Sequence, residues 1–134
     1  MSRSVHDNEV RSYTVDCERR TVTLRTVYPG SEPKEYTDIR FEGVAAYRFR
    51  DDCFGTILFG VAECGLPDFL SDLREELDAG RPWGWPGPWN VSFDAAVAYV
   101  RDEGLRAFAV RASIGLNGWV LAKSVSFTEG DGRA

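Results

Sequence analysis

The sequence predicts an α+β fold in which a mainly antiparallel sheet of about six strands packs against two amphipathic helices. Three observations lead to this prediction. Apolar and polar residues alternate in six segments, which is the period of a strand. Apolar residues recur at three- and four-residue spacing in two other segments, which is the period of a helix. The segments run as four strands, two helices and two strands, an order that favours an antiparallel sheet over alternating βαβ units.

The first two strands are separated by a short polar segment. Alternation covers residues 13–17 and begins again over residues 22–28. Glu18-Arg19-Arg20 lies between the two segments, so we expect them to form a hairpin.

The longest alternating segment spans residues 39–49, with Gly43 near its middle. A glycine inside a strand suits a bulge or bend, so we expect the strand to curve there. Asp51-Asp52 predicts a turn after it. The next segment, residues 56–62, is apolar at successive positions, which is typical of a central strand covered on both faces.

Two helices follow. The first begins at Leu66 and carries a stripe of apolar side chains, and we expect Gly80 to end it in the left-handed conformation. The second begins after Ser92 as N-cap and ends at Gly104. Each helix has one apolar stripe, so we expect each to lie on the sheet.

The last two strands cover residues 108–112 and 119–127. Asn117-Gly118 precedes the second, and this dipeptide is typical of a hairpin turn. At 134 residues the chain has the usual length of one domain, which we expect to span residues 1–134, with flexible ends at residues 1–8 and 128–134.

Charge and hydropathy exclude several classes of partner. The net charge of -5 repels a phosphate backbone, so we expect no nucleic-acid partner. No apolar run reaches the roughly 18 residues of a membrane span, and the first residues lack the apolar core of a signal peptide. We therefore expect a cytoplasmic protein with no membrane partner.

Motifs for catalysis, metal binding and nucleotide binding are missing. The three cysteines, Cys17, Cys53 and Cys64, form no Cys-x-x-Cys pair, and we expect them to be buried as small apolar residues. His6-Asp7 suits acid–base chemistry or one corner of a metal site, but such a site needs three or four ligands and the chain has one histidine. We therefore favour a turn or cap role for His6 and Asp7, and we expect no metal, no cofactor and no catalytic residue.

Residues 81–89 hold three tryptophans, Trp83, Trp85 and Trp89, together with three prolines. Tryptophan is enriched at binding hot spots, and a proline-stiffened loop loses little entropy on binding. The alternative is that the indoles fold back over an open end of the core. Next to this loop the first helix carries acidic residues that would attract a basic partner: Asp72, Glu75 and Glu76, with Asp68 and Asp78.

Three segments resemble small bacterial proteins of the YxiG-like kind, which occur among candidate immunity proteins of toxin systems. They are His6-Asp7 with the strand ending at Val15-Asp16, Phe41–Tyr47 leading to Ile57-Leu58-Phe59, and the closing Ser113–Trp119. The resemblance implies a compact α+β fold and a protein partner, and it implies no reaction.

The sequence thus favours a non-enzymatic protein-binding module, of the immunity type that masks a toxin or another protein. The alternative is a small-ligand-binding protein, or an enzyme, that uses a cleft between the sheet and the Trp/Pro loop. A homodimer that pairs through a strand edge or the tryptophans is a further alternative.

Overall fold

The computed structural model describes residues 3–132, which form eight strands, two α-helices and one short 3-10 helix. The strands are β1 (Glu9–Asp16), β2 (Thr21–Tyr28), β3 (Glu35–Glu42), β4 (Ala46–Arg50), β5 (Ile57–Cys64), β6 (Arg106–Ile114), β7 (Asn117–Ala122) and β8 (Ser124–Glu129). The helices are α1 (Leu66–Gly80), the 3-10 helix η1 (Arg81–Trp83) and α2 (Phe93–Asp102).

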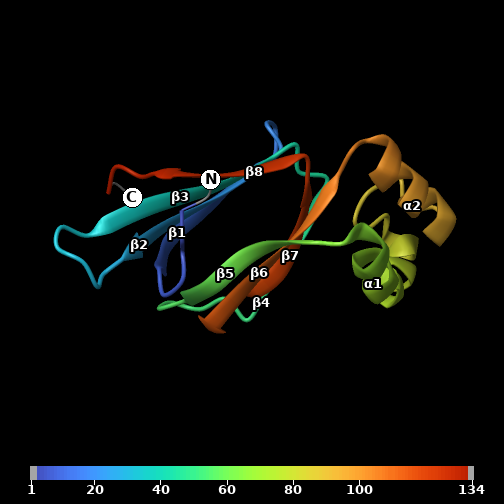
Figure 1. Ribbon diagram of the computed structural model, residues 1–134. Coiled ribbons are helices and arrows are strands. Elements are labelled where there is room, and N and C mark those ends of the chain that lie inside the picture. The colour runs from blue at the N-terminus through green and yellow to red at the C-terminus, as the bar shows by residue number, and fades with distance from the viewer. Residues whose placement is uncertain (1–2, 133–134) are drawn as a thin grey trace.

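All strands belong to one sheet with the order β4-β7-β6-β5-β1-β2-β3-β8, and every neighbouring pair is antiparallel. The predicted α+β class and antiparallel sheet are confirmed. β5 and β1 pair only at Glu9 and Ile57, so the sheet folds there into two layers. Figure 1 shows β1, β2, β3 and β8 in one layer and β4, β5, β6 and β7 in the other.

The predicted number of six strands is wrong because two long strands each bend into two. Gly43 has a φ of 63° and separates β3 from β4, as its position suggested. Lys123 separates β7 from β8, and its N–H donates to the Glu42 carbonyl over 2.9 Å. Since β3 pairs with β8 and β4 with β7, both segments of one long antiparallel pair cross between the layers at this point.

The main core lies between the two layers. β2 and β3 supply Val22, Leu24, Ile39 and Phe41, while β5, β6 and β7 supply residues such as Phe108 and Val120. The rings of Phe41 and Phe108 meet across the interface with centroids 5.7 Å apart. Burial of these side chains holds the layers together.

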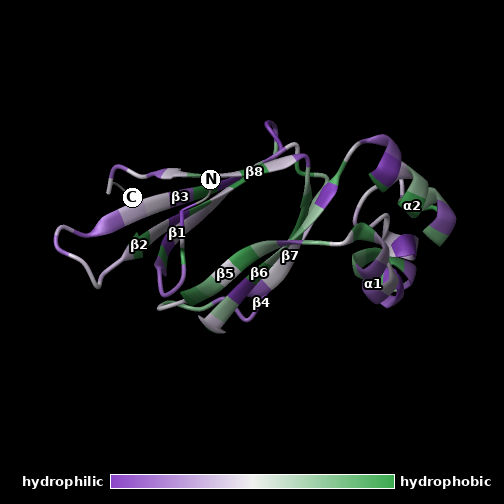
Figure 2. Cartoon of the chain, in the orientation of Figure 1, coloured by the Kyte–Doolittle hydropathy of each residue, from purple (hydrophilic) through white to green (hydrophobic). Residues whose placement is uncertain are grey.

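The helices cover one end of the outer face of β4, β6 and β7 and leave the rest of that face open (Figure 1). The expectation that each helix lies on the sheet is therefore confirmed, although the helices cover only one end of this face. Their apolar stripes do face the sheet: Leu70 and Val100 pack on Ala46, Ala107 and Leu121, and the hydrophilic residues lie elsewhere on each helix (Figure 2).

The helix ends agree with the sequence in three of four cases. α1 begins at Leu66 as predicted. The Ser92 hydroxyl accepts the Ala95 N–H over 3.1 Å, and Gly104 has the left-handed φ of 66°. Gly80 does not end α1 in that conformation, because its φ is -80° and the chain runs directly into η1. A Cβ on Gly80 would lie 2.8 Å from the Trp85 carbonyl oxygen, so close approach explains this glycine, and Gly84 supplies the left-handed residue.

Asn117-Gly118 is not the hairpin turn. Both residues begin β7, and Gly115-Leu116 makes the turn. A Cβ on Gly118 would lie 1.9 Å from the Arg48 carbonyl oxygen, so the glycine is required by its neighbour β4.

Two burial predictions are wrong. β5 lies inside the sheet as expected, but its outer face is open, and Phe59 there is 58% exposed. Cys17 and Cys53 are exposed and Cys64 is half-buried. Alternation alone does not reveal which face of a strand receives a covering layer.

Within the segments expected to be flexible, Val5 is buried in the main core and residues 128–129 belong to β8. Residues 1–2 and 133–134 of those segments lie outside the described part of the chain.

Candidate functional site

The Trp/Pro loop, residues 81–89, divides its three indoles between core and solvent. Trp89 stacks on Tyr99 with centroids 4.9 Å apart and planes 3° apart. Trp85 meets Trp119 edge to face at 6.1 Å, and the Arg48 guanidinium lies 4.5 Å from the Trp85 ring centroid. Trp83 is 86% exposed. Packing against the rest of the fold thus holds for Trp85 and Trp89, while Trp83 stays exposed and its role as a contact residue remains a prediction.

Two polar side chains fix this loop on the helices. The buried Asn90 side chain donates to the Leu77 carbonyl over 2.8 Å and to the Trp85 carbonyl over 2.9 Å. Arg81 donates to Asp78 over 3.0 Å and to Asn90 over 3.3 Å. Trp83 therefore projects from a rigid base, since the carbonyl groups around it are satisfied.

A shallow groove runs beside Trp83. Its walls are Glu75 and Glu76 of α1 on one side and Arg48 of β4 on the other, with Trp83 and Trp85 at its end. Glu76 pairs with Arg50 at 2.6 Å and with Arg48 at 3.6 Å, so this carboxylate braces α1 against β4 and is not free for a partner.

A separate shallow concavity lies farther along α1, where Asp68, Phe69 and Asp72 line it together with Trp119. Asp68, Asp72 and Glu75 recur at four- and three-residue spacing and so lie on one side of the helix. None of these three carboxylates makes an ion pair within residues 3–132. We call Trp83, Asp68, Asp72 and Glu75 the Trp83 surface, and Glu76, which was predicted with them, is instead engaged by Arg48 and Arg50.

His6 and Asp7 are not part of this surface. They lie in the turn before β1, with the His6 Nδ1 3.2 Å from the Asp7 carboxylate, and both side chains are more than half exposed. The His6 ring contacts Phe59 of β5 at 5.3 Å, and the Asp7 N–H donates to the Leu58 carbonyl over 2.9 Å. The described part of the chain holds no cluster of three His, Cys, Asp or Glu residues suited to a metal ion.

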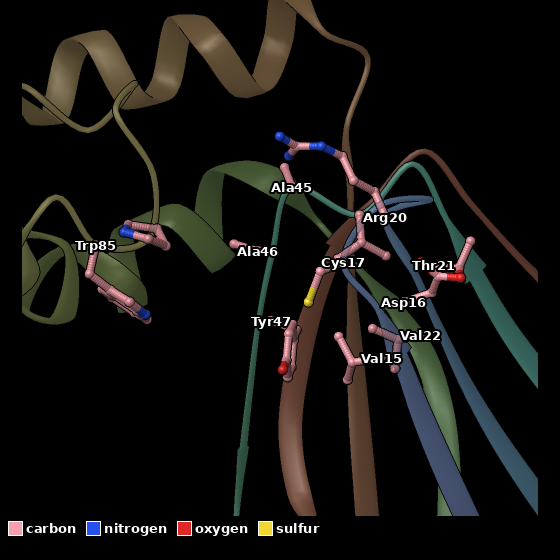
Figure 3. A pocket seen from close by; sticks show the side chains of 12 residues that line it. Val15, Asp16, Cys17, Arg20, Thr21, Val22, Ala45, Ala46, Tyr47 and Trp85 are labelled. Atoms are coloured by element: carbon pink, nitrogen blue, oxygen red, sulfur yellow. The ribbon is translucent and has the colours of Figure 1, made fainter.

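A second concavity lies on the other side of Trp85, between the sheet and the Trp/Pro loop (Figure 3). It has a volume of about 320 Å³. β1, β2 and the turn between them contribute residues that include Val15, Cys17 and Arg20, and the segment 44–47 contributes Tyr47, with Trp85 and Pro86 at the edge. We call it the sheet–loop cleft.

The sequence did not single out Asn90, Arg48 or Arg20. Asn90 acts through carbonyl groups that only the folded chain brings to it, and Arg48 meets Trp85 from a strand 37 positions away. A comparison of the chain with protein-family models, with curated proteins and with solved structures finds no match. No helix within residues 3–132 is long and apolar enough to cross a membrane.

Proposed function

We propose that this chain is a non-enzymatic protein-binding module whose contact surface is the Trp83 surface. The observation that carries the proposal is a tryptophan that is 86% exposed on a base fixed by buried hydrogen bonds. An exposed indole on a fixed backbone binds a partner with little loss of backbone conformational entropy.

The gain available from this side chain is large. Burying an aromatic side chain removes roughly 150–250 Å² from water. At about 25 cal/mol per Å² this is worth about 4–6 kcal/mol before the costs of association. Trp83 therefore has the properties of a binding hot spot.

The charges beside Trp83 indicate the partner's chemistry. Asp68, Asp72 and Glu75 make no ion pair within residues 3–132, so a partner with a basic rim around an apolar pocket would complement the surface. Following the resemblance to candidate immunity proteins, we infer that this partner is a toxin or another protein that the chain masks.

Capture on the immobilised chain from a lysate of the source cells tests the proposal. Trp83→Ala should remove the captured partner and leave thermal unfolding unchanged, because the indole packs on nothing. Phe54→Ala is the matched control, since Phe54 is fully exposed in the β4–β5 loop, away from the helices. Retention of every partner by Trp83→Ala would rule out the Trp83 surface. Light scattering on the same samples separates a foreign partner from a second copy of the chain.

A second candidate function is small-ligand binding in the sheet–loop cleft. It is favoured by the cleft's volume of about 320 Å³ and by its mainly apolar walls, both typical of ligand sites. Trp85 lines both this cleft and the groove beside Trp83, and the two share no other lining residue.

A further inference from the structure

The sheet–loop cleft is a gap between two strand edges that meet at both of its ends. β4 pairs only with β7, and β1 pairs with β5 at a single position, so the facing edges of β1 and β4 carry no strand between them. At one end the Val44 N–H donates to the Arg20 carbonyl over 2.9 Å. At the other, Tyr13 of β1 meets Phe49 of β4 with centroids 5.7 Å apart. These two contacts bound the gap at its two ends.

We propose that this cleft binds a small amphipathic anion, with an apolar or aromatic body and one carboxylate. The inference deepens the small-ligand proposal and is independent of the Trp83 surface. The apolar body is specified by the walls: Val15, Val22, Val44, Ala45 and Ala46 form the interior, and the rings of Tyr47 and Trp85 stand at the entrance.

Arg20 is the residue that would bind the carboxylate of the ligand. Its guanidinium reaches over the mouth of the cleft beside Ala45 (Figure 3) and makes no ion pair or hydrogen bond within residues 3–132. A planar guanidinium is the side chain best suited to bind a carboxylate.

The backbone holds Arg20 in place. Its φ of 56° is uncommon for a residue other than glycine, asparagine or aspartate, and its carbonyl is fixed by Val44. Such conformations persist where the surrounding structure imposes them, often beside functional sites.

The one carboxylate of the cleft, Asp16, is engaged by the turn. It accepts the Arg19 N–H over 3.0 Å, and the Arg19 guanidinium lies 4.0 Å away. Arg19 thus offsets the charge of Asp16, and Arg20 is left for the ligand.

The test uses 2-naphthoate as probe, with 2-naphthamide and 2-naphthylmethylamine as its neutral and cationic analogues. Cys17 lines the cleft and Cys53 does not, and both thiols are exposed. The alkylation rate of each by iodoacetamide, read by mass spectrometry, reports occupancy with an internal control. We expect 2-naphthoate to slow alkylation of Cys17 and not of Cys53, and the amide to do so only at higher concentration.

Arg20→Gln should raise the 2-naphthoate concentration needed for half protection about tenfold, the loss expected for one charged hydrogen bond. Arg25→Gln, at an arginine of β2 that does not line the cleft, should leave it unchanged. Arg20→Gly removes the same charge and suits the positive φ. If the glutamine variant does not fold, the glycine variant tests whether the charge of Arg20 sets the 2-naphthoate concentration needed for half protection. Absence of protection, equal protection by the amide, or better protection by the amine would overturn the proposal.

Discussion

At the residue scale, the site depends on a few polar side chains whose partners lie far along the chain. Asn90 is the main example, because its amide holds the carbonyls of Leu77 and Trp85 at once. In the sequence it is a polar residue between a tryptophan and a helix cap. Its role depends on burial, which no local pattern shows.

Asn90→Ala should lower the free energy of unfolding by about 2–3 kcal/mol, because two buried carbonyls lose their donor. Denaturant unfolding measures this value. The neighbouring Val91 is 69% exposed, and Val91→Ala should stay within about 0.5 kcal/mol of the wild type. Equal effects of the two changes would contradict the role given to Asn90.

Tyr13 gives a prediction for alkaline pH. Its hydroxyl donates to the Asp52 carboxylate over 2.6 Å. That hydrogen bond raises the pKa of Tyr13 above its ordinary value, and burial and the negative charge of Asp52 act in the same direction. The folded state therefore favours the neutral phenol.

The resulting stabilisation is fully present below the unfolded pKa of about 10 and is lost as the pH rises through the folded pKa. Absorbance at alkaline pH should show one tyrosine that titrates late. In Tyr13→Phe the late transition should disappear, and unfolding should become less dependent on pH above 10. A late transition that persists in the variant would assign it to another tyrosine.

At the element scale, the sequence predicted where strands and helices lie better than it predicted how they end. Alternation continues through Gly43 and Lys123, so two bent strands were each predicted as one. Gly80 and Gly118 were interpreted as a helix end and a turn, yet each is required by the backbone or side chain of another segment. Such contacts between segments distant in sequence leave no local signal. The same reason explains why Trp83, Trp85 and Trp89 were found as a group while their division between core and solvent was not.

Gly118→Ala tests the close approach of β7 and β4. The added Cβ would lie 1.9 Å from a backbone oxygen of Arg48, so the strands must separate, and we expect a loss of about 2–3 kcal/mol. Gly60 in β5 has no atom within 4 Å of such a Cβ. Gly60→Ala should therefore leave stability nearly unchanged in the same unfolding experiment, and a similar loss in both variants would contradict the account.

At the scale of the whole molecule, the two layers share one core, and the helices close one end of it. Phe41 joins the layers through Phe108, so Phe41→Ala should cost about 3–5 kcal/mol. Phe59→Ala, on the open outer face, should cost far less. Circular dichroism and tryptophan fluorescence should follow one coincident transition, and two separate transitions would show that the layers unfold independently.

The same arrangement leaves two proposed binding surfaces near Trp85. Trp89 and Trp119 pack against the buried clusters and Trp85 contacts Trp119, while Trp83 contributes to none of the clusters. Trp83 has a large side chain on a fixed backbone, and the fold does not use that side chain. It is therefore the strongest indication of a partner.

Hydroxyl-radical footprinting of the free chain and of its captured complex tests this claim most directly. In the free chain Trp83 should be the most readily oxidised of the four tryptophans, since it is 86% exposed. Binding of the partner should suppress oxidation of Trp83 and leave that of Phe54 unchanged. Oxidation of Trp83 that is equally fast in the complex, with protection elsewhere on the chain, would contradict the proposed surface.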